Sequence, residues 1–106
     1  MLTTELHNKA LKAAETATAD YVSKYGEHDA CGFAWVTAYV NGASKLGKSF
    51  KAQGFTRAYG GGWQLWNPSN SYTQSVSAKE AGADAYVRTV RAELEDVKLY
   101  ANSRLD

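Results

Sequence analysis

The sequence has very few of the residues that define specialised protein classes, with one cysteine, one proline and one methionine among 106 residues. A single cysteine, Cys31, excludes an intrachain disulfide and a metal cage made only of thiolates. No apolar run approaches the ~18 residues that span a membrane, and the N-terminus lacks a basic segment followed by an apolar stretch. We therefore expect a cytoplasmic protein that does not associate with membranes.

Net charge is also small, because 12 basic residues nearly balance 11 acidic residues to give +1. Whole-chain electrostatics therefore does not steer the protein toward nucleic acid or an anionic membrane. A chain of this length normally has one hydrophobic core, so we expect a single domain over residues 1–106.

Residues 3–25 carry small apolar side chains at steps of three and four, which predicts an amphipathic helix within residues 1–26. Thr3 or Thr4 can cap its start, and Gly26 can end it. The apolar stripe is mostly alanine and buries little area per turn. The helix therefore needs a flat partner, either a sheet or a second copy of itself.

The rest of the fold lies in residues 32–102, where strand and helix patterns alternate. A capping box at Ser77 and Glu80 predicts the start of the last helix, and residues 103–106 are expected to form a tail. The expected elements are a strand over 32–40, a helix over 44–53, a hairpin of strands 55–59 and 63–67, a helix over 77–94 and a strand over 96–102.

The resulting βαββαβ order resembles that of the ferredoxin-like superfold, in which two helices cover one face of a four-stranded antiparallel sheet. We therefore expect an α+β ferredoxin-like sandwich with an additional N-terminal helix. This superfold hosts many functions, so the resemblance implies no particular chemistry. The stretch from Cys31 to the C-terminus also resembles short uncharacterised bacteriophage proteins, which would place the protein in the host cytoplasm.

The middle of the chain differs from its flanks in charge and in aromatic content. Between Asp29 and Glu80 there are five basic residues and no acidic residue. Nine of the 13 aromatic residues, including all three tryptophans, lie in the same interval. Basic side chains among aromatic ones suit single-stranded nucleic acid, because cations neutralise phosphates while rings stack on bases.

Strand alternation would gather several aromatic rings on one face of the predicted sheet. If Val36, Leu65, Val97 and Leu99 face the helices, the opposite face carries Phe33, Trp35, Tyr39, Trp66 and Tyr100. This placement is similar to the aromatic sheet surface of an RRM, but residues 61–66 lack the basic first position and the aromatic spacing of that motif. Two interpretations stay open: the N-terminal helix or a second subunit covers this face, or the face binds a ligand.

These patterns predict a small binding or interaction module. Lys45, Lys48 and Lys51 recur every three residues and could contact a phosphate backbone, although a solvated helix face has the same spacing. The first hypothesis is single-stranded nucleic acid binding, and the alternative is a phage-type protein that binds and modulates a host protein through the same surface. The candidate binding residues are Trp35, Tyr39, Lys45, Lys48, Lys51, Arg57 and Trp66.

Catalysis is the less favoured class. His28, Asp29 and Cys31 are close in sequence, but their spacing matches no established catalytic or metal site, and an ordinary connecting turn is expected there. Paired carboxylates in an apolar setting are not evident. We therefore predict no catalytic residues, no metal and no cofactor.

Self-association is the last expectation from the sequence. A small domain with surplus aromatic surface commonly buries that surface in a symmetric contact. We expect a homodimer that forms through the alanine-rich helix or through the aromatic sheet face.

Overall fold

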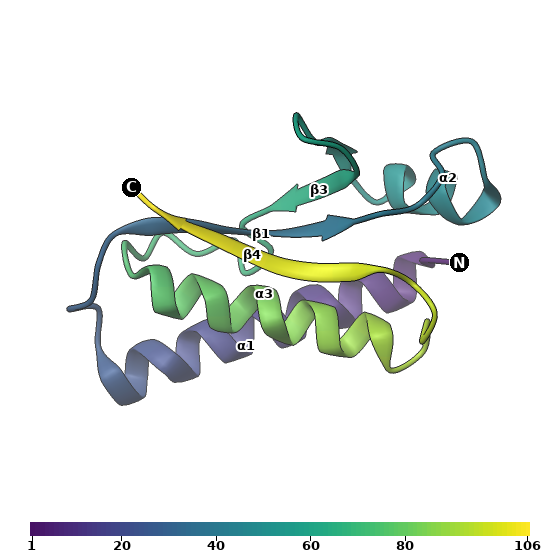
Figure 1. The fold of residues 1–106 in the computed structure, drawn as a ribbon. Helices are drawn as coiled ribbons and strands as arrows, with labels where there is room; N and C mark the ends of the chain where they lie inside the picture. The colour runs from purple at the N-terminus through teal and green to yellow at the C-terminus, as the bar shows by residue number, and fades with distance from the viewer.

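The computed structural model describes residues 1–106, whose helices and strands form two layers (Figure 1). All strand pairs are antiparallel, and the sheet order is β2-β3-β1-β4. This arrangement confirms the α+β class, and β3 and β1 are the central strands of the sheet. The elements in chain order are α1 (Thr4–Tyr25), β1 (Gly32–Ala38), α2 (Lys45–Ala52), β2 (Thr56–Arg57), β3 (Trp63–Trp66), α3 (Val76–Arg91) and β4 (Leu99–Leu105).

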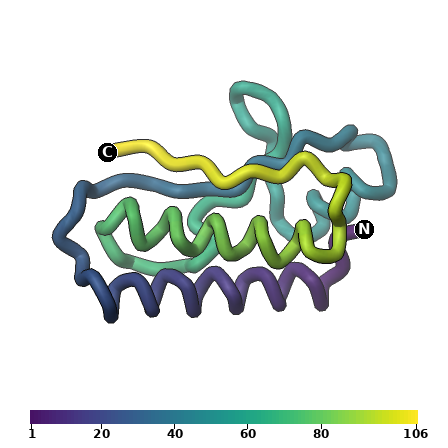
Figure 2. Tube along the Cα trace, turned by 60° about the horizontal axis from the view of Figure 1, so that its bottom comes forward, coloured from purple at the N-terminus to yellow at the C-terminus, as the bar shows by residue number.

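The helical layer consists of α1 and α3, which run antiparallel side by side beneath the sheet (Figure 2). The sequence predicted that the helix between the first two strands would cover the sheet, but α2 lies beyond one end of β1 instead (Figure 1). Its eight residues span only about 12 Å at 1.5 Å per residue. The helix that lies beside α3 in the helical layer is the N-terminal helix α1 (Figure 2). No helix of the structure is long and apolar enough to cross a bilayer.

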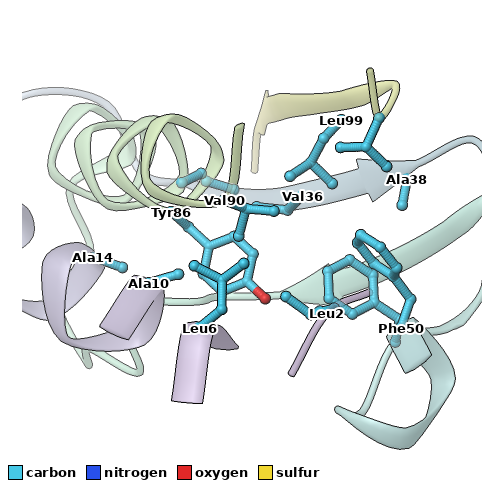
Figure 3. Packing of buried hydrophobic residues seen from close by; sticks show 14 residues of the cluster. Leu2, Leu6, Ala10, Ala14, Val36, Ala38, Phe50, Tyr86, Val90 and Leu99 are labelled. Carbon is cyan, nitrogen blue, oxygen red and sulfur yellow. The ribbon is translucent and has the colours of Figure 1, made fainter. Parts of the chain in front are cut away.

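The hydrophobic core lies between β1 and the two long helices (Figure 3). β1 contributes Ala34, Val36 and Ala38, each no more than 1% exposed. α1 contributes Ala10 and Ala14, which are fully buried. These alanines are therefore used inside one chain and are not free to form the interface of a homodimer.

Close contact between α1 and α3 depends on small residues on both helices. A Cβ at Gly82 of α3 would collide with the Thr18 hydroxyl of α1 and lie 3.2 Å from the Ala14 carbonyl oxygen. The Thr18 hydroxyl donates a hydrogen bond of 2.7 Å to the Ala78 carbonyl oxygen. Because the residues at this contact are small, α1 and α3 pack closely enough for the Thr18 side chain to form a hydrogen bond with the backbone of α3.

A polar pair lies within this otherwise apolar core. A hydrogen bond of 2.6 Å joins Nδ1 of His7 to the hydroxyl of Tyr86, and their rings meet edge to face. Burial lowers the pKa of His7, which is 7% exposed, and raises the pKa of Tyr86 above its ordinary value. Both effects favour neutral side chains, so the pair satisfies its polar atoms without a buried charge.

The start of α3 differs from the predicted capping box. The helix begins at Val76, and Ser75 is its N-cap, accepting a hydrogen bond from the Ala78 N–H at 3.1 Å. Asp29 supports this cap by accepting hydrogen bonds from the Ser75 hydroxyl and from the Ser77 N–H. The carboxylate lies 46 residues before the cap, a distance that no local motif reveals.

Strand boundaries also differ from the predictions: the first strand ends at Ala38 and not at residue 40, and the last strand begins at Leu99 and not at residue 96. The strand expected over 55–59 pairs only at Thr56 and Arg57. The expected tail at 103–106 instead continues β4 as far as Leu105. β4 pairs with β1 along its whole length, because a central strand needs hydrogen-bond partners on both sides.

Acidification should destabilise the fold through His7. The folded state holds this imidazole neutral with a lowered pKa, whereas the unfolded chain takes up a proton near the ordinary pKa. His7 therefore contributes stability that is complete above about pH 6.5 and is lost as the pH falls toward the lowered value, at a slope of at most about 1.4 kcal/mol per pH unit. Urea unfolding at several pH values measures this slope. His7→Gln should reduce it, and His28→Gln, at an exposed position, should retain it.

Because Ser75 caps α3, we expect Ser75 and Ser77 to contribute unequally to the stability of the fold. Ser75→Ala removes the acceptor of the Ala78 N–H and the donor to Asp29, and should lower the free energy of unfolding by about 1 kcal/mol. Ser77→Ala keeps the backbone N–H that binds Asp29 and should cost less. Thermal unfolding of both variants compares them, and equal losses would contradict Ser75 as the cap.

Candidate binding surface

The strand register places the large aromatic rings on the sheet face away from the helices. Trp35 of β1 lies opposite Trp66 of β3, and Thr37 lies opposite Tyr100 of β4. This surface, which we call the aromatic face, consists of Phe33, Trp35, Tyr39, Trp66 and Tyr100. Its rings are well exposed: Trp66 by 44%, Tyr100 by 48% and Tyr39 by 52%. Since α1 packs against α3 in the other layer, the N-terminal helix does not cover this face (Figure 2).

The rings of the aromatic face contact one another. Trp35 and Trp66 stack at a tilt, with their centroids 4.8 Å apart and an interplanar angle of 33°. Phe33 meets Trp66 edge to face at 6.2 Å, and Tyr39 meets Tyr100 at 6.0 Å. Neighbouring rings limit one another's movement, so their contacts hold the aromatic face in one arrangement.

The turn between β2 and β3 rises above the aromatic face, on the side away from the helices (Figure 1). Between turn and sheet lies a pocket of about 320 Å³, which we call the turn pocket. A Cβ at Gly62, whose φ is +79°, would lie 3.0 Å from both the Ala38 oxygen and the Tyr39 ring. Glycine there therefore allows the turn to lie close to β1. The lining residues used below are Trp35, Thr37, Tyr39, Tyr59, Trp66 and Asn102.

A second pocket of about 650 Å³ lies where α2, β2 and the loop after β1 meet. We call it the basic pocket, because Lys48, Lys51 and Arg57 line it and no acidic residue does. Lys51 Nζ lies 5.0 Å and the Arg57 guanidinium carbon 5.9 Å from the centroid of the Trp63 ring. The one ion pair of the chain joins Lys9 and Glu93, so these three cations have no carboxylate partner.

The two pockets adjoin. Tyr39 lines both of them, and the glycines of the turn divide between them, with Gly61 in the turn pocket and Gly62 in the basic pocket. An aromatic cavity and a cationic cavity therefore form one continuous surface. The residues that line the two pockets include three cations and no carboxylate.

The structure brings together six of the seven predicted binding residues. Trp35 and Trp66 line the turn pocket, Tyr39 lines both pockets, and Lys48, Lys51 and Arg57 line the basic pocket. Lys45 stands apart from both pockets at the first position of α2. Steps of three residues fall short of a full helical turn, so three lysines at this spacing drift around the helix and do not form one row.

Three further residues of the surface were missed by sequence reasoning. Trp63 could have been noticed, because it follows the glycine turn within the basic interval. Asn102 joins the site because it lies opposite Trp35 in the β1–β4 register. Tyr59 was assigned to a strand but lies in the turn, fully exposed. No local pattern marks Asn102 or Tyr59 as part of a site.

The segment with His28, Asp29 and Cys31 has a structural role in this fold. Asp29 caps α3, and the hydrogen bond from Ser75, followed by that from Ser77, lowers the pKa of the Asp29 carboxyl to about 2. Cys31 is an exposed free thiol. No three or more His, Cys, Asp or Glu side chains lie near enough together to hold a metal ion.

Comparisons with known proteins add no assignment. No protein-family model, no curated protein and no solved structure matches the chain at a significant level.

The open aromatic face predicts that Trp66 contributes little to folding. Trp66→Ala removes a ring that is almost half exposed, so the free energy of unfolding should fall by only about 1 to 2 kcal/mol. Phe50→Ala, which empties a fully buried site, should cost about 3 to 5 kcal/mol. Chemical denaturation measures both values. If Trp66→Ala lowers the free energy of unfolding as much as Phe50→Ala does, another element must bury the Trp66 ring.

Proposed function

We propose that the protein is a small module that binds single-stranded nucleic acid, with bases on the aromatic face and phosphates in the basic pocket. The observation that carries the proposal is the adjacency of two chemically different pockets at Tyr39. Single-stranded nucleic acid alternates flat apolar bases with anionic phosphates along one chain. A ligand of this kind can occupy both pockets at once.

The aromatic side of the surface suits unpaired bases. In the Trp35–Trp66 stack, the exposed Trp66 offers an indole surface to a base, and stacking of one base on an aromatic side chain contributes about 1 to 3 kcal/mol. Phe33 packs against Trp66 at its edge and supports the stack. A double helix hides its base faces, so this surface favours single strands over duplex.

The basic side of the surface suits phosphates. Lys48, Lys51 and Arg57 have no carboxylate to displace before they contact a ligand. Each phosphate neutralised releases condensed counterions, which makes binding favourable at low salt and weaker at high salt. Two of these cations also lie over the Trp63 ring, which keeps their charges at the pocket wall.

We also propose that the fold is a variant of the ferredoxin-like sandwich, in which α1 replaces the first crossover helix. The order β2-β3-β1-β4 and the helical connection from β3 to β4 through α3 support this interpretation. In such a sandwich the face opposite the helices is free for ligands. The proposed binding face is that free face.

A protein partner on the same aromatic face is the competing function, and the exposed rings of this face favour it. The partner would be a host protein, or a second copy of the chain in a homodimer. An interface built on aromatic anchors changes little with salt, whereas phosphate contacts weaken steeply. Salt dependence therefore separates the two functions.

Short single-stranded oligonucleotides should quench the tryptophan fluorescence, because stacking places bases against Trp35 and Trp66. Trp66→Ala should then weaken binding by about 1 to 3 kcal/mol. Lys48→Ala should lower the slope of log affinity against log salt concentration by about one unit, because one phosphate contact is lost. Fluorescence titration at several salt concentrations measures both effects.

Lys12→Ala provides the matched control, since Lys12 is an exposed lysine on α1 in the other layer. It removes the same net charge as Lys48→Ala but should leave the salt slope unchanged. Unaltered fluorescence with oligonucleotide at low salt would contradict nucleic acid binding and favour a protein partner. Light scattering then tests whether that partner is a second copy.

A further inference from the structure

The turn pocket holds a polar group that the sheet register positions, the side-chain amide of Asn102. The Thr37 hydroxyl donates a hydrogen bond of 2.8 Å to Oδ1 of Asn102. Thr37 is only 4% exposed although its side chain is on the aromatic face, because neighbouring side chains surround it. In this arrangement the Oδ1 end of the Asn102 amide is directed toward Thr37.

With Oδ1 facing Thr37, the Nδ2 end of the amide is the group that a ligand can contact. Nδ2 of Asn102 carries two N–H donors and has no partner within the protein. Asn102 lines the turn pocket together with Trp35 and Trp66, and it lies directly opposite Trp35 in the sheet. The pocket therefore combines a stacking surface with a hydrogen-bond donor at its border.

This combination matches the two parts of an unpaired nucleobase. The face of a base is flat and apolar, and its edge carries ring-nitrogen or carbonyl acceptors. We propose that the turn pocket binds one unpaired nucleobase, with its face on Trp66 and Trp35 and its edge accepting a hydrogen bond from the Asn102 amide. The inference rests on the proposed nucleic acid binding and assigns to that function a base-reading residue.

Charge supports a nucleotide as the occupant over an uncharged aromatic molecule. The basic pocket begins at Tyr39, on the border of the turn pocket, and contains three cations and no acid. A base in the turn pocket would therefore carry its phosphate toward a site of complementary charge. Thr37 is a positioning residue in this arrangement, because it acts only through Asn102.

The test compares an oligonucleotide with bases to one without them. The probes are hexathymidylate, whose bases carry two carbonyl acceptors, and a hexamer of the same phosphate backbone made of abasic residues. Asn102→Ala should weaken binding of hexathymidylate about tenfold and leave binding of the abasic hexamer unchanged. Thr37→Val keeps Asn102 but removes the hydroxyl that orients it, and should weaken only hexathymidylate, by several-fold.

Asn8→Ala is the matched control, because Asn8 is exposed on α1 in the other layer. If Asn102→Ala behaves like Asn8→Ala with hexathymidylate, base reading by Asn102 is wrong although nucleic acid binding stands. If Asn102→Ala weakens binding of both probes equally, Asn102 has only a structural role, and the inference is also overturned. Failure of the unaltered protein to bind hexathymidylate at low salt would overturn the proposed function itself.

Discussion

The alternation of side chains along β1 is the constraint on which the rest of the structure depends. On one side, Ala34, Val36 and Ala38 are small enough to let two helices approach the sheet. On the other side, Trp35 and Tyr39 are large and remain partly or largely exposed. A shift of one residue would bury the aromatic rings against the helices and expose the alanines. The pairing of β1 with both β3 and β4 prevents this shift, so the same register determines the core and the candidate site.

The distribution of charge along the chain keeps acidic residues out of the two pockets of the candidate surface. The acidic residues lie outside the stretch between Asp29 and Glu80, which supplies β1, α2, β2 and β3. The strands and helix that build the pockets therefore bring cations together without carboxylates to neutralise them. An overall charge of +1 hides this local excess. Local potential, and not the net charge, governs attraction of an anion that comes within a Debye length of the surface.

The parts of the structure that were predicted correctly depend on local sequence periodicity. The alternation over residues 33–39 identifies β1 and the composition of its two faces, and a step of three to four identifies α1. The cap of α1 was narrowed to Thr3 or Thr4, and Thr3 is the cap, because a capping residue lies beside the helix that it begins. In each case the interacting residues are close in sequence.

The parts that were missed depend on residues far apart in sequence. The cap of α3 uses Asp29, and Asn102 enters the site through its pairing with β1. The length of β4 is likewise set by the strand beside it and not by its own polar residues, such as Ser103 and Arg104. β4 lies at the edge of the sheet and has a solvated face, so it needs few apolar residues. Its polar end therefore looks like an unstructured tail in the sequence.

The displacement of α2 from the helical layer links the fold to the proposed chemistry. A crossover helix packed under the sheet would direct its polar side away from the aromatic face, and its lysines would lie in the other layer. In this fold α1 lies beside α3 and α2 lies at the end of β1 (Figure 1), so Lys48 and Lys51 line a pocket that borders Tyr39. Phe50 still inserts into the core and anchors the short helix (Figure 3). The N-terminal helix therefore does more than complete the core, since its position leaves the basic residues of α2 beside the aromatic rings.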